Sequence, residues 1–207
     1  MLKKSILIIS ACLIFTVGFL AGCSEKEVPA EKATAENSVV LPAEINKPTT
    51  IEGTGTIEVA FSPNGGAEEA IVDEINGAKS SIKVQAYTFT NSKISKALLH
   101  AQKRGVDVQI ILDKSQQTSK YSPLKFFADN SIPVKIDNDF QIAHNKIMII
   151  DEKTVITGSF NFTKAAAEKN AENLLIIRGN QKLTALYLKN WAWRWNSTQE
   201  PKLQTQK

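Results

Sequence analysis

Residues 144–163 read HNKIMIIDEKTVITGSFNFT, and this stretch decides how the sheet of the protein is built. It contains two runs of β-forming residues, Ile147–Ile150 and Thr154–Thr157, separated by the polar turn Asp151–Lys153. Short apolar runs bounded by turn residues are typical of buried strands. The stretch therefore predicts a hairpin of two paired strands.

Four polar side chains flank this hairpin at one end. His144 and Lys146 are two residues apart, as are Ser159 and Asn161. Side chains two apart on a strand point to the same face, so each pair is expected to act together. The hairpin would bring an imidazole, an ammonium, a hydroxyl and an amide around one point. This set suits a phosphodiester, which has a negative charge and needs donors on its oxygens.

The spacing of these residues resembles the signature of the phospholipase D superfamily. That signature is HxKxxxxD, found here from His144 to Asp151, followed by GSxN, found from Gly158 to Asn161. The chain is more similar still to the small bacterial nucleases of the superfamily, which have a single motif, dimerise and cleave nucleic acid without metal. The resemblance runs from about Val59 to the C-terminal helix and includes Phe61-Ser-Pro-Asn-Gly-Gly, Ala86-Tyr-Thr-Phe-Thr and Glu172-Asn173.

The resemblance implies a homodimer. Superfamily members use two copies of the motif, in tandem or from two subunits, and this chain has one copy. A twofold dimer would place the active site across its axis. One His144 would then form a phosphohistidine, while the His144 of the second copy protonates the leaving oxygen and later activates water.

The resemblance also assigns roles to the neighbouring residues. Lys146 and Asn161 would hold the non-bridging phosphate oxygens, and Ser159 would bond the phosphate or orient the site. Glu172 matches the acidic residue that hydrogen-bonds the histidine in the family, although a plain surface glutamate is an alternative.

Asp151 and Gly158 are interpreted as structural parts of the motif. Asp151 sits where a strand ends and is expected to pair with backbone or with a cation at the turn. No His, Cys, Asp and Glu residues have the spacing of a metal site. We therefore predict activity without a metal or any other cofactor.

The N-terminal residues resemble an export signal. Lys3 and Lys4 precede an apolar stretch, Ser5–Phe19, which is too short and poorly flanked for a spanning helix. Leu20-Ala21-Gly22-Cys23 looks like the lipobox of bacterial lipoproteins, so residues 1–22 are interpreted as a signal peptide and Cys23 as the lipidated residue. An ordinary signal peptide or a short anchor is the alternative. The expected location is the periplasmic or extracytoplasmic face of a membrane.

Residues 23–56 are expected to be a flexible acidic tether, and residues 57–207 the catalytic domain. Residues 24–58 contain seven Glu and three Lys, a local charge of −4, with few aromatic residues. From residue 59 onward there are 20 Lys and Arg against 14 Asp and Glu, which gives +6. A basic domain suits nucleic acid or an anionic membrane surface, although a solvated basic face is also common.

Strand and helix patterns alternate through the domain. This alternation predicts an α/β fold with a mixed, largely parallel sheet and helices on both faces. The expected elements, in chain order, are strand 57–61, helix 67–79, strand 81–89, helix 91–104, strand 106–112, helix 121–130, strand 132–136, the hairpin, strand 172–178 and helix 181–195.

Two other features leave alternatives open. The tryptophans Trp191, Trp193 and Trp195 could stack on bases, but packing in the core or at a subunit contact is the favoured interpretation. The polar loop from Lys114 to Lys120 follows a strand end, where loops that contact substrates often lie. Its lysines could touch phosphates or could simply be solvated.

The sequence therefore predicts a phosphodiesterase but leaves its substrate open. The favoured function is a nuclease that acts on DNA or RNA with little sequence preference. The alternative is a phospholipase D that hydrolyses phospholipid head groups, and the shared chemistry does not separate the two. A non-catalytic binding protein at the cell surface is a third class, which the complete motif argues against.

Overall fold

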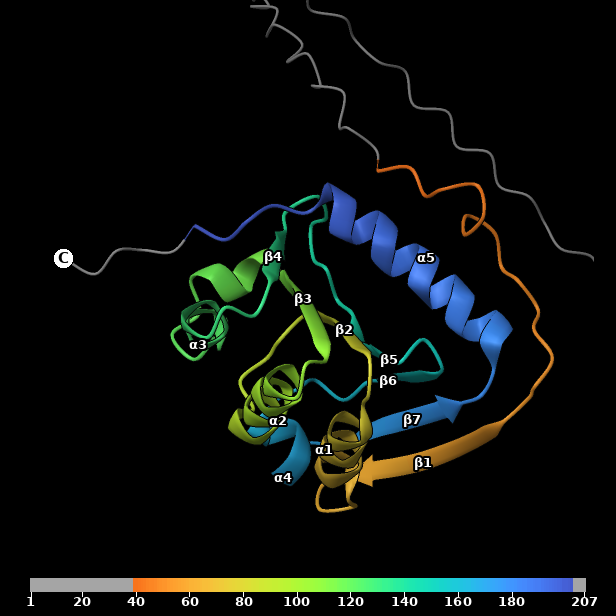
Figure 1. Cartoon of the computed structure of the whole chain (residues 1–207), viewed down its shortest axis with the longest axis horizontal. Coiled ribbons are helices and arrows are strands. Elements are labelled where there is room, and N and C mark those ends of the chain that lie inside the picture. The colour runs from red at the N-terminus through yellow and green to blue at the C-terminus, as the bar shows by residue number, and fades with distance from the viewer. Residues whose placement is uncertain (1–38, 203–207) are drawn as a thin grey trace, which may run out of the picture. The chain divides into compact units, whose positions relative to one another are not determined.

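The computed structural model describes residues 39–202, which form a seven-stranded mixed sheet with the strand order β1-β7-β6-β5-β2-β3-β4 (Figure 1). The elements, in chain order, are β1 (Thr56–Ser62), α1 (Ala67–Gly77), β2 (Ser81–Ala86), α2 (Ser92–Lys103), β3 (Asp107–Asp113), the 3-10 helix η1 (Lys114–Gln117), α3 (Leu124–Asp129), β4 (Val134–Asp137), β5 (Lys146–Ile150), β6 (Thr154–Gly158), α4 (Lys164–Glu168), β7 (Glu172–Arg178) and α5 (Gln181–Ser197).

Helices cover both faces of the sheet, as predicted. Residues of α1, α2, α3 and α4 pack with one face in the main hydrophobic core, while α5 packs against the other face. The alternation of β5 explains this arrangement: Met148 and Ile150 enter the main core, and Ile147 and Ile149 meet Trp191 on α5. The packing interpretation of Trp191 is confirmed, since it is 4% exposed.

The sheet is mixed, but the prediction that it is largely parallel is wrong. The pairs β2–β3 and β3–β4 are parallel, and the other four pairings are antiparallel. Two hairpin-like connections cause the difference. The turn after β5 returns directly as β6, and the short helix α4 turns the chain back into β7. Only the first part of the domain has helical crossovers between parallel strands.

Local signals set most of the helix boundaries. The Asn91 side chain caps α2 by accepting hydrogen bonds from Lys93 N and Ile94 N, a contribution of about 1 kcal/mol for such caps. Gly105 follows the helix with a φ of 91°, where a left-handed residue ends it. Helix α3 begins later than predicted because Pro123, which suits a helix start, stands directly before it. Tyr121 is therefore left in a loop.

Each of the seven strands has one end on the same side of the sheet. We call this row of strand ends, which runs across the strands, the polar edge; its residues are Ser62, Ala86, Asp113, Asp137, Lys146, Gly158 and Glu172. The chain crosses this edge between most of the strands, so loops distant in sequence meet there. The turn Asp151–Lys153 lies at the opposite edge.

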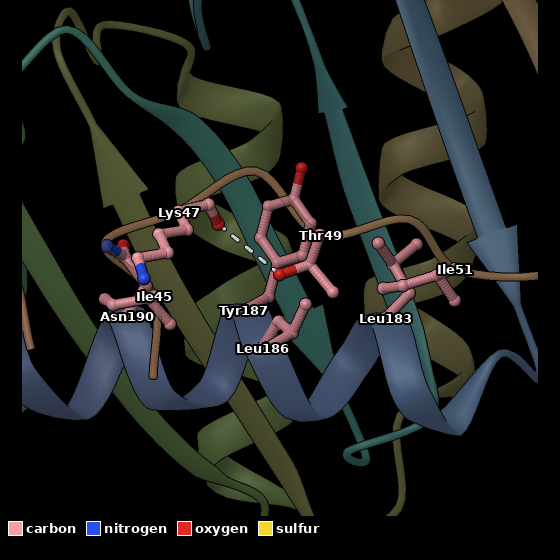
Figure 2. A pocket seen from close by; sticks show the side chains of 8 residues that line it. All are labelled: Ile45, Lys47, Thr49, Ile51, Leu183, Leu186, Tyr187 and Asn190. Carbon is pink, nitrogen blue, oxygen red and sulfur yellow. Dashed lines mark hydrogen bonds between the residues drawn. The ribbon is translucent and has the colours of Figure 1, made fainter. Parts of the chain in front are cut away.

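Residues 39–55 contain no helix or strand and run along α5. Figure 2 shows this segment above α5, with Ile45 by Asn190 and Ile51 by Leu183, where together they line a groove. The Asn180 side chain donates a hydrogen bond to the Glu52 carbonyl. The predicted signal peptide, the lipidated Cys23 and the first part of the tether lie outside the described residues.

Between residues 39 and 202, the helices are all too short or too polar to cross a bilayer. The predicted lipid on Cys23 lies outside these residues and stays a prediction.

Candidate active site

Lys146 and His144 form the centre of the polar edge. β5 begins at Lys146, so His144 lies in the segment just before the strand and not within it. The Lys146 Nζ atom lies 3.0 Å from both ring nitrogens of His144 and donates to the His144 carbonyl at 3.1 Å. Lys146 is 8% exposed, whereas the imidazole of His144 is open to solvent. An accessible nucleophile thus lies beside a buried cation.

Burial has a chemical effect on this lysine. It lowers the pKa of the Lys146 ammonium, because an apolar environment disfavours the charged form, while the negative charge of Glu172 acts in the opposite direction. The fold therefore buries an ammonium whose charged form is destabilised by its surroundings. Shifted pKa values of this kind are common at functional sites.

Tyr87 is a neighbour that the sequence did not single out. Its ring centroid lies 4.5 Å from that of His144, and the Lys146 Nζ atom lies 5.2 Å from the Tyr87 ring. Tyr87 follows β2, and its N–H donates to the Asn145 carbonyl at 2.8 Å. The only sequence signal was its place in Ala86–Thr90, a segment noted for its resemblance. The ring limits how far the imidazole can rotate.

Ser159 and Glu172 are directly bonded to each other. The Ser159 hydroxyl donates to Glu172 Oε2 at 2.6 Å and accepts from Asn173 N at 3.0 Å, while Asn170 donates to Glu172 Oε1 at 3.1 Å. The predicted hydrogen bond between Glu172 and a histidine is not formed with His144 of the same chain. Within one chain the carboxylate instead orients the serine.

Gly158 allows these groups to come together. Its φ is 152°, and a Cβ at this position would lie 2.3 Å from the Asn173 carbonyl oxygen. The close approach of β6 and β7 at this point sets Ser159 against the start of β7. Because any other residue would push the strands apart, the structural role predicted for Gly158 has a clear physical reason.

Asn161 is placed by the aromatic residues on either side of it. Phe160 and Phe162 are both fully buried, which leaves Ser159 and Asn161 on the other side of the alternating chain. The Asn161 Oδ1 atom is buried and has no hydrogen-bond partner among the described residues. An unpaired buried polar atom is uncommon and calls for an explanation, and a role in a functional site is one.

The segment before His144 is fixed from two sides. The buried carboxylate of Asp113 accepts a hydrogen bond from Ala143 N at 2.7 Å, and Lys114 donates to the Phe140 carbonyl at 2.9 Å. The guanidinium of Arg194 lies 4.0 Å from the Phe140 ring centroid. These contacts hold the chain where it enters the site, and they could not be predicted from the sequence.

Asp151 lies far from this chemistry, at the opposite edge. Its carboxylate accepts hydrogen bonds from the backbone of Lys79, Ser80 and Ser81 and from the Ser80 hydroxyl. Burial, the largest influence, would raise the pKa of Asp151, but these hydrogen bonds together outweigh it and lower the pKa. Asp151 ties the loop before β2 to the hairpin turn.

The structure thus brings His144, Lys146, Ser159, Asn161 and Glu172 to one edge and sets Asp151 apart. Across residues 39–202, no group of three or more His, Cys, Asp or Glu side chains is arranged to hold a metal ion. The site offers one nucleophile, one cation and a set of hydrogen-bonding groups. This arrangement is suited to attack on an anionic phosphorus centre.

A family model described as "Cardiolipin synthase, PLD-like domain" matches residues 71–195, more than half of the chain. The chain belongs to the phospholipase D superfamily. It is therefore a phosphodiesterase, and the predicted family and reaction class are confirmed.

Individual relatives of the superfamily agree with this assignment. The chain is 47% identical over 135 residues to a "Phospholipase D" of Rickettsia conorii, a match that covers 65% of this chain and 67% of that protein. It is 30% identical over 118 residues to the "Mitochondrial cardiolipin hydrolase" of Mus musculus, covering 57% and 53%. The crystal structure of Nuc, a phospholipase D family member from Salmonella typhimurium, matches with 43% identity and a TM-score of 0.68, covering 70% of this chain and 96% of Nuc.

Proposed function

We propose that this phosphodiesterase is a metal-independent endonuclease that cleaves DNA or RNA through a phosphohistidine at His144. The single observation behind the proposal is the position of the Lys146 ammonium, 3.0 Å from both ring nitrogens of an exposed imidazole. A phosphate attacked by His144 would have this cation beside its non-bridging oxygens. Asn161, whose buried oxygen has no partner among the described residues, lies on the same edge.

The reaction proceeds in two balanced steps. A ring nitrogen of His144 attacks phosphorus, a P–N bond forms, and the bond from phosphorus to the leaving oxygen breaks as a general acid protonates that oxygen. Water then attacks phosphorus and gives its proton to the same group, now a base. The P–N bond breaks and the imidazole is restored.

The acid has to come from outside the single chain. In an in-line displacement, the nucleophile and the leaving oxygen lie on opposite sides of phosphorus, so one imidazole does not serve both. The other histidine, His100, is an exposed residue of α2 and is not part of the site. We therefore propose a twofold homodimer in which His144 of the second copy is the acid.

An uncovered apolar surface suits this second copy. Three alternating residues of the edge strand β1 are exposed on the face that α5 covers elsewhere: Ile57 at 62%, Val59 at 52% and Phe61 at 63%. Their partners on β7 include Leu175 and Ile177, which are only half-buried. Exposed apolar strands at a sheet edge commonly mark an interface. Phe61 lies at the polar edge, so this interface would adjoin the site.

The substrate assignment rests on charge and on the resemblance to small single-motif nucleases. The excess of +6 from residue 59 onward favours a polyanion. A specific observation favours the alternative, phospholipid hydrolysis: several relatives that are 46–47% identical are named phospholipase D. The chemistry at phosphorus is the same in both.

Parallel assays in EDTA test the proposal. The purified chain and its His144→Ala variant are each given plasmid DNA, RNA and phosphatidylcholine vesicles. We expect the unmutated chain to cleave nucleic acid and the variant to be inactive, and mass spectrometry of acid-free quenched samples should find phosphate on the His144 peptide. Choline release without nucleic-acid cleavage would establish the phospholipase instead. A fully active monomer would contradict the dimeric site.

We also propose that the enzyme works at the extracytoplasmic face of a membrane, held by lipid on Cys23. The support is the lipobox pattern of residues 20–23. Fractionation of cells that express the chain or its Cys23→Ser variant tests this. The unmutated chain should sediment with membranes, and equal distribution of both chains would rule the anchor out.

A further inference from the structure

Residues 114–125, which we call the loop although they include η1 and the first residues of α3, are a polar and basic segment that begins at the polar edge. It contains Lys114, Lys120 and Lys125 and no acidic residue. Lys125 is paired with Asp129, whereas Lys120 has no carboxylate partner within residues 39–202, and Lys114 donates to a backbone carbonyl. Two positive charges are therefore left uncompensated on this loop.

The loop is ordered by its own hydrogen bonds. The buried side chain of Gln116 accepts from Phe89 N, and Asp113 accepts from Ser115 N. Two turns follow, since Ser119 N donates to the Ser115 carbonyl and Ser122 N donates to the Ser119 carbonyl. The loop therefore presents its exposed side chains in defined positions.

Tyr121 is exposed on this ordered loop. Its exposed fraction is 72%, and the Lys120 Nζ atom lies 5.7 Å from its ring centroid. Because the ring is mostly exposed to solvent, packing within the chain does not explain its position. An aromatic face next to a cation is the combination on which proteins stack bases and bind the adjoining phosphate.

The loop starts close to the catalytic histidine. It follows β3, which is two strands from β5 in the sheet order, so the end of β3 and the start of β5 are roughly 10 Å apart at about 4.8 Å per strand. A hollow of about 410 Å³ lies beside it, lined by polar residues such as Gln117, Ser119 and Lys120.

We propose that residues 114–125 form a binding subsite for a single strand of nucleic acid. Tyr121 stacks on a base a few nucleotides from the scissile bond, and Lys120 binds the phosphate next to that base. The inference rests on the proposed nuclease function and specifies its substrate as a single-stranded or locally unpaired strand.

The composition of the loop favours nucleic acid over a membrane. A surface that enters lipid presents several apolar side chains together. Of the apolar residues between 114 and 125, Leu124 is buried at 5%, and Tyr121 alone is large and exposed. The remaining exposed positions are lysines and small polar residues, which bind phosphates and not acyl chains.

Binding measurements separate these possibilities. The whole chain with His144→Ala, which leaves the probe uncut, is titrated with a fluorescent 12-nucleotide oligodeoxythymidylate in EDTA at several salt concentrations. Adding Tyr121→Ala should weaken binding about tenfold, and Tyr121→Phe should keep it within about twofold. Lys120→Ala should reduce the slope of log affinity against log salt by about 0.7. Lys103→Ala, at the opposite edge, is the matched control and should change neither.

Each outcome has a separate meaning. Unchanged affinity with Tyr121→Ala would overturn the subsite, even if the unmutated chain cleaves nucleic acid. Weaker binding of the Tyr121→Ala chain to phosphatidylglycerol vesicles, with the oligonucleotide bound as before, would overturn it in favour of a membrane contact. If the oligonucleotide result is as expected but the unmutated chain cleaves no nucleic acid, the subsite stands and the proposed nuclease activity fails.

Discussion

The Lys146 ammonium and the His144 imidazole lie 3.0 Å apart, and only the histidine is open to solvent. The buried cation beside the imidazole would attract the anionic phosphate to the nucleophile and hold its non-bridging oxygens. One side chain can thus position the substrate for attack and stabilise its charge.

Replacing Lys146 should remove most of the activity. Lys146→Met should lower kcat/KM about 100-fold or more, as is usual when a group that stabilises transition-state charge is removed. Circular dichroism should show the fold retained, because the lysine lies at the start of a strand and a methionine can occupy the same space. Activity within a few-fold of the unmutated chain would exclude the proposed role.

The pH profile should report the same lysine. Burial lowers the pKa of Lys146, so its proton is lost at a lower pH than that of a free lysine, whose pKa is about 10.4. Activity that needs the ammonium should therefore fall as the pH rises through this lowered pKa. The Lys146→Arg variant keeps its positive charge, so its activity should fall only at a higher pH, even if its kcat is lower at every pH. Lys103→Arg serves as the control and should leave the profile in place.

Gly158→Ala should destabilise the domain and disrupt the site together. The new Cβ would overlap the Asn173 carbonyl, and the positive φ is strained for alanine, so we expect a loss of about 2–4 kcal/mol in the free energy of unfolding. Urea titration measures it. Gly77→Ala is the control, because a Cβ there meets nothing within 4 Å, and its stability should be equal or slightly higher. Equal stability of the two variants would show that the strands can separate.

Asp151→Asn should destabilise the domain without changing the chemistry of the site. The carboxylate accepts hydrogen bonds from three backbone N–H groups, so we expect a loss of about 1–2 kcal/mol at neutral pH with kcat unchanged. The pKa of Asp151 is lowered by folding, so its contribution is present above the unfolded pKa, about 3.9, and is lost as the pH falls through the folded value. Thermal melts between pH 7 and pH 2 should therefore converge for the two chains. Glu152→Gln, an exposed neighbour, should follow the unmutated chain throughout.

Arg194→Met should be strongly destabilising. Arg194 is 3% exposed and forms a buried ion pair with Asp137, which is 2% exposed. Removing one partner leaves an uncompensated buried charge, at a cost of about 3–5 kcal/mol. Adding Asp137→Asn to the same chain should recover part of this loss in urea titrations. Lys189→Met on the exposed side of α5 is the control, and a similar small effect from both methionine variants would refute the prediction.

The residues of the motif could be predicted because their chemistry is local. His144 and Lys146, and Ser159 and Asn161, are each two residues apart in the short segments that border β5 and β6, and the structure brings all four to one edge. The ends of α2 are predictable for the same reason: a cap at Thr90 or Asn91 and a helix end at Gly105 each depend on a few neighbouring residues, and the structure has the cap at Asn91.

Contacts between segments that are distant in the sequence could not be predicted from it. The antiparallel pairing of β5 with β2 depends on which strands meet in space, so the sheet is less parallel than the alternation of elements predicted. The hydrogen bond from Ala143 to Asp113 joins residues 30 apart, and the packing of Tyr87 on His144 joins residues 57 apart. Neither leaves a periodic pattern in the chain. The bond between Ser159 and Glu172 likewise required the geometry of β6 and β7.

The contact between residues 45–51 and α5 shortens the reach of the enzyme. With lipid on Cys23 as proposed, a tether that was free up to the start of β1 would have 33 residues and extend at most roughly 110 Å. If the chain is already docked at Ile45, 22 residues remain, and the limit falls to roughly 75 Å. The catalytic domain would then sample a thinner layer above the bilayer at a higher local concentration, and two anchored copies would meet more often.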